Sequence, residues 1–122
     1  MRRRGFTLVE MLVALLILII LAGIVFGAYS FVDTATRRQL TEGRVQALGI
    51  KATESLGIGG RPPAALMDLA PALGSPAWMR GGQCLDGWER PIRYSTRGTS
   101  FRIWSAGSDG IEGTADDIEF SR

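Results

Sequence analysis

The segment between Ser105 and Ser121 concentrates acidic side chains and contains no basic one. Its five carboxylates belong to Asp109, Glu112, Asp116, Asp117 and Glu119. Crowding them into a short, glycine-rich loop is unfavourable unless a cation lies among them. Oxygen ligands without histidine or cysteine select a hard ion, and a flexible loop prefers calcium to magnesium. From these residues alone, a solvated acidic turn without an ion is an equal alternative.

Other kinds of site chemistry lack their residues. The chain has no histidine and one cysteine, Cys84, which excludes histidine-based acid–base catalysis, Cys/His zinc sites and intrachain disulfides. A membrane-anchored enzyme using Asp116 and Asp117 with the hydroxyls of Ser105 and Ser108 is one alternative. It lacks an activating base, because Lys51 is the only lysine and is distant in the sequence. We therefore expect that the chain is not an enzyme.

Short strands should frame the acidic loop. Apolar and polar residues alternate over residues 92–94 and 101–104, and the turn Arg97-Gly98-Thr99 joins them into an antiparallel hairpin. A third strand is expected around Ile118 and Phe120. Three strands give one apolar face that can pack on a helix. The expected domain is α+β, with a long N-terminal helix packed against a small three-stranded antiparallel sheet.

An amphipathic helix should precede the sheet. From Asp33 to about Leu56, charged residues separate apolar ones at near-helical spacing, and glycines and prolines over residues 57–63 end the pattern. The expected apolar positions are Leu40, Val45, Leu48, Ala52 and Leu56. Residues 64–69 predict a short helix and residues 71–87 a loop.

Four further side chains have expected places in the structure. We expect Trp78, Trp88 and Trp104 in the core. For Cys84, we favour a buried or passive thiol over an intermolecular disulfide.

Residues 11–32 carry no charge and are apolar on every face of a helix. About 22 residues make a helix of about 33 Å, enough to cross a bilayer core of about 30 Å. Arg2, Arg3 and Arg4 precede the run, so the positive-inside rule places residues 1–5 in the cytoplasm and the C-terminal part outside. One alternative is a plain signal anchor. Another is a cleaved secretory signal, but no Ala-x-Ala-like cleavage site follows the apolar run.

The basic balance of the chain comes from its N-terminus. The 14 basic and 12 acidic residues give a formal charge of +2. Without Arg2, Arg3 and Arg4, the remainder has 11 basic and 12 acidic residues. Phosphate binding needs clustered basic side chains on the working domain, so we expect no nucleic-acid partner.

One carboxylate interrupts the start of the apolar block. Glu10 in hydrocarbon costs about 2.5–3.5 kcal/mol on insertion scales, so it needs a partner. The stretch Arg4-Gly5-Phe6-Thr7-Leu8-Val9-Glu10 closely resembles the class III signal of type IV pilins and pseudopilins. The resemblance implies that a prepilin peptidase cuts between Gly5 and Phe6 and methylates the new amine of Phe6. It also implies that Glu10 neutralises the Phe6 amine of a neighbouring subunit during filament assembly.

The domain organisation follows from this resemblance. Residues 1–5 form a leader peptide, residues 6–32 a transmembrane and filament-core helix, and residues 33–122 a periplasmic pseudopilin domain. The implied fold is pilin-like.

Two C-terminal stretches resemble the major pseudopilins of type II secretion systems. Residues 105–118 are similar to their calcium loop, and residues 86–94 are similar to their motif Asp-x-Trp-Gly-Asn-Pro-x-x-Tyr, with Glu89-Arg90 in place of Gly-Asn. By position, the implied calcium ligands are the side chains of Asp109, Asp116 and Asp117 and backbone carbonyls near Ala106 and Ile111. In that family the ion folds the loop.

The implied function is that of a structural subunit in the periplasmic pseudopilus of a type II secretion system. The implied partners are further copies of the chain in a helical filament, minor pseudopilins, the inner-membrane assembly platform, the prepilin peptidase and the membrane. The protein would cross the bacterial inner membrane once. The alternative is a type IV pilin or minor pilin for adhesion, motility or DNA uptake. Surface pilins usually carry a C-terminal disulfide loop, which one cysteine cannot form.

Overall fold

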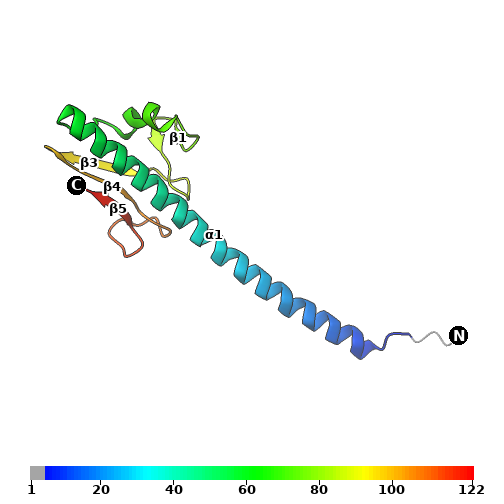
Figure 1. Cartoon of the computed structure of the whole chain (residues 1–122). Helices are drawn as coiled ribbons and strands as arrows, with labels where there is room; N and C mark the ends of the chain where they lie inside the picture. The colour runs from blue at the N-terminus through cyan, green and yellow to red at the C-terminus, as the bar shows by residue number, and fades with distance from the viewer. Residues whose placement is uncertain (1–4) are drawn as a thin grey trace. The chain divides into compact units, whose positions relative to one another are not determined.

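The computed structural model describes residues 5–122, so Arg2, Arg3 and Arg4 of the expected leader lie outside the described residues. The chain divides into two compact units, Met1–Asp33 and Thr34–Arg122, and one helix, α1 (Leu8–Gly59), runs through both (Figure 1). The remaining elements are η1 (Leu66–Leu69), η2 (Pro71–Leu73), β1 (Met79–Arg80), β2 (Gln83–Cys84), β3 (Arg93–Arg97), β4 (Ser100–Ser105) and β5 (Ile118–Ser121). The architecture is α+β and pilin-like, as predicted.

In the first unit, α1 exposes every side chain. Residues 8–33 contribute nothing to a core, and most of their exposed side chains are leucine, isoleucine, valine and phenylalanine. By length and composition, α1 is the one helix among the described residues that could cross a membrane.

In the second unit, α1 buries one stripe against the rest of the domain. Val45, Leu48 and Ala52 are buried as predicted, and they form a single core with Phe101, Ile103 and Ile118 of the sheet and residues of η1 and the β1–β2 hairpin. The prediction for Leu40 is wrong, because this side chain is 49% exposed. Its neighbour Thr41 is buried instead, with its hydroxyl donating to the carbonyl of Arg37 (2.8 Å).

The helix ends three residues later than predicted. The N–H of Gly60 donates to the carbonyl of Leu56 (2.8 Å), and Gly60 has a left-handed φ of 68°. This is the usual role of a glycine that follows the last helical turn.

The predicted three-stranded sheet is confirmed. Its strands are antiparallel in the order β3-β4-β5, and Tyr94, Ile103 and Phe120 lie side by side on the face that packs on α1. The rings of Phe101 and Phe120 stack at 6.1 Å. Gly49 of α1 faces the Phe120 ring so closely that a Cβ at this position would collide with it. The helix can pack this closely on the sheet only because residue 49 has no side chain.

Residues 71–87 correct the sequence analysis, which predicted a loop. They contain η2 and a hairpin in which Met79 pairs with Cys84 and Arg80 with Gln83. The turn is Gly81-Gly82, both with left-handed φ (62° and 76°), which suits a two-residue hairpin connection. Strands of two residues are too short to give an alternating pattern, so the pair of glycines was the only available signal.

The tryptophans divide between the core and the surface. Trp78 and Trp88 pack against the core as expected. The prediction for Trp104 is wrong: it lies on the outer face of the sheet, with the guanidinium of Arg102 4.6 Å from its ring centre.

The Cys84 thiol should be unreactive in the folded protein. It is 2% exposed, and burial raises its pKa to about 11. At pH 8 the thiol is therefore shielded from reagents and almost entirely protonated. We expect iodoacetamide to label Cys84 at least about tenfold more slowly in the folded protein than after denaturation. Intact-mass spectrometry measures this, with a Ser121→Cys variant as an exposed control. Equal labelling rates for the folded and unfolded chain would contradict it.

Candidate functional site

The residues of the expected processing site are accessible. Gly5 and Phe6 precede α1, and Phe6 is 82% exposed. Among the described residues, no atom beyond the chain neighbours of Gly5 lies within 4 Å of a Cβ built on it. A peptidase could therefore reach the Gly5–Phe6 bond without opening folded structure.

Glu10 has a partner within its own chain. The N–H of Thr7 donates to Glu10 Oε2 (2.9 Å), the Thr7 hydroxyl donates to the same oxygen (3.1 Å), and the N–H of Glu10 donates to Thr7 Oγ1 (3.2 Å). This reciprocal pair is a capping box at the N-terminus of α1, where a negative charge also favours the helix dipole. The Glu10 carboxylate is thus bound to the N–H of Thr7, the residue next to Phe6, whose nitrogen cleavage after Gly5 would free.

In the acidic loop, Asp116 is the centre of a hydrogen-bond network. Thr114 Oγ1 donates to its Oδ1 (2.6 Å), while Ser108 Oγ (2.8 Å) and the N–H of Asp109 (3.0 Å) donate to its Oδ2. These hydrogen bonds lower the pKa of Asp116 well below its ordinary value, and the bond from Thr114 has the largest effect.

The other expected ligands also face donors of the loop itself. Asp109 Oδ1 accepts from the N–H of Ile111 (2.9 Å), Asp117 Oδ2 accepts from the N–H of Gly113 (2.7 Å), and the carbonyl of Ile111 accepts from Thr114 Oγ1 (3.0 Å). Gly107, Gly110 and Gly113 take the left-handed φ that this tight path needs. Ala106, expected to offer a carbonyl, directly follows β4.

The remaining two acids pair with arginines of the sheet. Glu112 contacts Arg93 (3.2 Å) and Glu119 contacts Arg102 (2.7 Å). Within residues 5–122, no group of three or more histidine, cysteine or acidic side chains is arranged to hold a metal ion. The oxygen donors suit calcium chemically, but hydrogen bonds already give the loop a fixed form. Calcium binding therefore remains a prediction.

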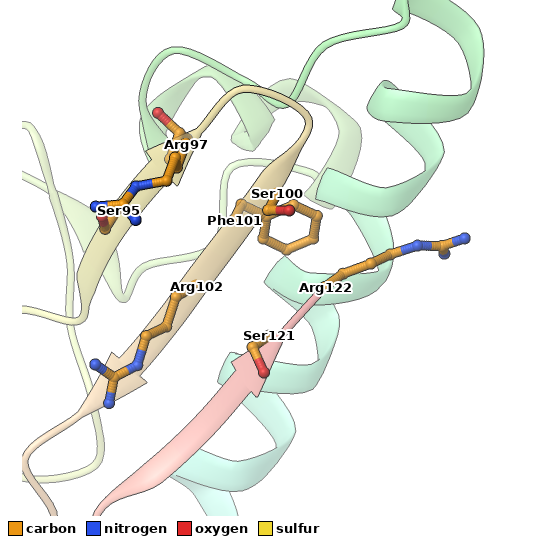
Figure 2. A pocket seen from close by; sticks show the side chains of 8 residues that line it. Ser95, Arg97, Ser100, Phe101, Arg102, Ser121 and Arg122 are labelled. Carbon is orange, nitrogen blue, oxygen red and sulfur yellow. The ribbon is translucent and has the colours of Figure 1, made fainter.

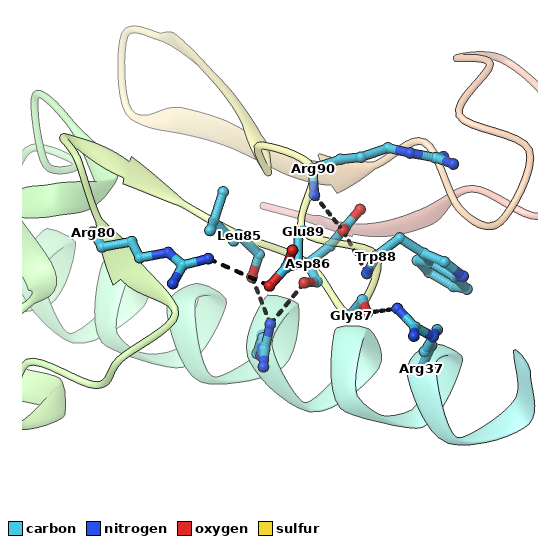
Figure 3. A network of polar contacts seen from close by, with 9 residues as sticks. Arg37, Arg80, Leu85, Asp86, Gly87, Trp88, Glu89 and Arg90 are labelled. Atoms are coloured by element: carbon cyan, nitrogen blue, oxygen red, sulfur yellow. Dashed lines mark hydrogen bonds and ion pairs between the residues drawn. The ribbon is translucent and has the colours of Figure 1, made fainter. Parts of the chain in front are cut away.

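A second polar centre, which the sequence analysis did not identify, lies in the turn of residues 85–90 (Figure 3). We call it the Asp86 turn. Asp86 is 1% exposed; its Oδ1 accepts from the N–H groups of Trp88 and Arg90 (both 2.9 Å) and its Oδ2 from Ser105 Oγ (2.7 Å). A buried carboxylate is acceptable here because each oxygen is hydrogen-bonded.

The Asp86 turn is bound to α1 through its backbone. Arg44 Nη1 donates to the carbonyls of Leu85 (3.0 Å) and Asp86 (2.7 Å), and Arg37 Nη1 donates to that of Gly87 (3.1 Å). In return, the N–H of Gly87 donates to Thr41 Oγ1 (2.8 Å). A Cβ at residue 87 would collide with the Arg37 carbonyl, so this approach requires glycine.

Arg90 connects the Asp86 turn to the acidic loop. Its Nη1 donates to the carbonyl of Gly107 (3.0 Å) and its Nη2 to that of Ser108 (3.2 Å). Glu89 precedes it with a left-handed φ of 60°. Glu89 thus supplies the left-handed residue of this turn, and Arg90 supplies a cationic side chain that holds the loop.

Comparison with known proteins identifies the N-terminal segment. Residues 1–26 match the family model described as the prokaryotic N-terminal methylation motif. No curated protein and no solved structure matches the chain. The match covers the segment with Gly5, Phe6 and Glu10 and the first part of the exposed apolar helix. The chain thus carries the N-terminal signal of a type IV pilin-like prepilin, on a pilin-like α+β fold.

Proposed function

We propose that this protein is a structural subunit of the periplasmic pseudopilus of a type II secretion system. The observation that carries the proposal is the methylation motif over residues 1–26, together with the first part of α1, where every side chain of residues 8–32 is exposed. A prepilin peptidase would cut the accessible Gly5–Phe6 bond and methylate Phe6. The retained helix would then polymerise with further copies, giving a protein that is structural and not catalytic.

The location follows from the same features. The helix would cross the inner membrane once, with the leader in the cytoplasm and the second unit in the periplasm. Minor pseudopilins and the inner-membrane assembly platform would be its partners during filament growth.

A type IV pilin or minor pilin of a surface filament is the second candidate. The cysteine content favours the pseudopilus, because Cys84 is single and buried and no disulfide loop can form within the chain. Comparing exoprotein secretion with adhesion, motility and DNA uptake in a deletion strain separates the two functions.

Intact-mass spectrometry tests the processing step. Protein purified from membranes that contain a prepilin peptidase should lack residues 1–5 and carry one added methyl group on Phe6. Protein from membranes without the peptidase should keep residues 1–5 and carry no added methyl group. A mature N-terminus at any other position would refute the proposal.

Replacing Glu10 by alanine should permit insertion and processing but block assembly. Once Phe6 is N-terminal, its buried ammonium needs a carboxylate, and breaking a buried ion pair costs about 3–5 kcal/mol. Filament yield should therefore fall by at least about tenfold, as measured by shearing and immunoblotting. Glu42→Ala, which removes an exposed acid paired with Arg38, is the matched control. Wild-type yield from Glu10→Ala would rule out the pairing role.

We also propose that calcium stabilises the acidic loop through Asp109, Asp116 and Asp117. For the full chain in detergent, calcium at 100 times its dissociation constant should stabilise folding by about 2.7 kcal/mol and raise the melting temperature by several degrees relative to a chelator. Asp117→Asn should reduce this shift, whereas Glu42→Ala should keep it. The same melting temperature with and without calcium would mean that hydrogen bonds alone hold the loop.

A further inference from the structure

Arg90 reaches the acidic loop from outside it. Figure 3 shows its side chain extended away from Asp86, and its guanidinium donates to the carbonyls of Gly107 (3.0 Å) and Ser108 (3.2 Å). A Cβ built on Gly110 would collide with the same guanidinium, so the backbone of Gly110 lies directly against it. One cationic group therefore contacts three backbone positions at the start of the loop.

The Asp86 turn fixes the position of Arg90. The N–H of Arg90 donates to Asp86 Oδ1 (2.9 Å), and its carbonyl accepts from the N–H of Asp86 (2.8 Å). The carbonyl of Asp86 accepts in turn from Arg44 of α1 (2.7 Å), and the Asp86 side chain is buried. The guanidinium is therefore held at the loop by the core of the second unit, so the order of the loop does not depend on its own residues alone.

The contact of Arg90 differs from those of two other arginines in this region. Arg93 pairs with Glu112 and Arg102 pairs with Glu119, and all four of these side chains are exposed. Arg90 is half-buried and binds backbone oxygens instead. Hydrogen bonds from a charged donor are roughly twice as strong as neutral ones, and partial burial shields them from water.

The acidic loop needs this support because its own carboxylates repel one another. In the part of the chain that the structure describes, Asp109, Asp116 and Asp117 accept hydrogen bonds from donors of the loop and form no ion pair. Like charges crowded into one short loop disfavour its closed form. A guanidinium on the neighbouring carbonyls offsets part of this repulsion.

We propose that Arg90 is a positioning residue that holds the acidic loop in its closed form, in which Asp116 accepts from Thr114 and Ser108, so that calcium meets a preformed loop. The part of this inference that concerns calcium rests on the calcium binding proposed above. The affinity of a site falls in proportion to the fraction of molecules in which the site is formed. A loop that opens without Arg90 would therefore bind calcium more weakly.

Hydrogen exchange measures the order of the loop without any metal. In full-length protein in detergent with a chelator, the amides of residues 105–118 should exchange at least about tenfold faster in Arg90→Ala than in the wild type. Arg90→Lys, which keeps the charge but loses the planar pair of donors, should give an intermediate rate.

Arg97→Ala is the matched control for the loss of one positive charge. Arg97 is exposed and lines a pocket of about 300 Å³ at the end of β4 opposite the loop (Figure 2). Its removal should leave the exchange of residues 105–118 at the wild-type rate.

Titration of the same proteins with calcium chloride tests the second step. By isothermal titration calorimetry, the dissociation constant for calcium should rise at least about threefold in Arg90→Ala and stay at the wild-type value in Arg97→Ala. Val45→Ala controls for a general loss of stability, because it shortens a buried core side chain of α1. It should lower the melting temperature and leave the dissociation constant unchanged.

The outcomes separate the role of Arg90 from calcium binding itself. Loop amides that exchange no faster in Arg90→Ala would overturn the ordering role and leave calcium binding standing. Faster exchange with an unchanged or smaller dissociation constant would overturn the calcium step, because repulsion between the guanidinium and the ion would then offset the order that Arg90 provides. If the wild type binds no calcium, the calcium proposal fails and the calcium step fails with it, whereas the ordering role stands or falls on the exchange rates alone.

Discussion

The Gly5→Ala variant is expected to accumulate in the membrane as an uncut precursor, with processing reduced at least about tenfold. Within residues 5–122, no atom beyond the chain neighbours of Gly5 lies within 4 Å of a Cβ built on it, so the added methyl group meets no packed side chain there. The loss must therefore arise in the peptidase, whose active site has to accommodate the backbone on the leader side of the scissile bond. Pulse labelling followed by immunoblotting measures the fraction of chain that is cut.

Two glycines of the same helix provide matched controls. Gly23 and Gly27 also have no atom within 4 Å of a built Cβ, and neither lies at the cleavage site. Alanine at either position should be cut normally and should favour the helix by about 0.5–1 kcal/mol. Normal cleavage of Gly5→Ala, at the same bond or elsewhere, would contradict the assignment of Gly5.

The Asp86→Ala variant should be strongly destabilised. The change leaves three donors around residue 86, the N–H groups of Trp88 and Arg90 and the hydroxyl of Ser105, without their acceptor. An unsatisfied buried donor costs about 1–3 kcal/mol, so we expect a loss of about 3–5 kcal/mol. This is a large share of the 5–15 kcal/mol typical of a domain, and it should lower the melting temperature by more than about 10 °C.

Two variants distinguish the hydrogen bonds of Asp86 from a general effect of removing an acid. Asp86→Asn keeps the Oδ1 acceptor for both backbone donors and should cost clearly less than alanine. Glu42→Ala, at an exposed pair with Arg38, should change stability by less than about 0.5 kcal/mol. Thermal unfolding followed by circular dichroism measures all three, and a melting temperature of Asp86→Ala near that of the parent would show that the turn does not hold the domain.

The elements that the sequence predicts well are those with a local period. Alternation around Phe101 and Ile103 gives the strand and its buried face, and the spacing of Val45, Leu48 and Ala52 gives the helix stripe. Both patterns are decided by neighbours within a few residues. The uncharged run of residues 11–32 is readable for the same reason.

The buried polar residues could not be predicted in this way. Thr41 meets Gly87 across 46 positions, and Asp86 meets Ser105 across 19, so no local window contains both partners. Hydropathy places threonine and aspartate at the surface, whereas these two are buried because distant donors satisfy them. Of the candidate site, the processing residues follow from one contiguous motif, while the arrangement of the loop depends on Arg90, 17 positions before Gly107.

The complete exposure of residues 8–32 has a thermodynamic consequence for the proposed filament. Lipid tails are about as apolar as the leucines and isoleucines of this helix. Moving the helix from the bilayer to the filament core therefore transfers it between two apolar environments. Little free energy of water exclusion is gained or lost in that transfer. Growth and dissolution of such a polymer would then be nearly balanced, and a few polar contacts at its subunit boundaries would decide the direction.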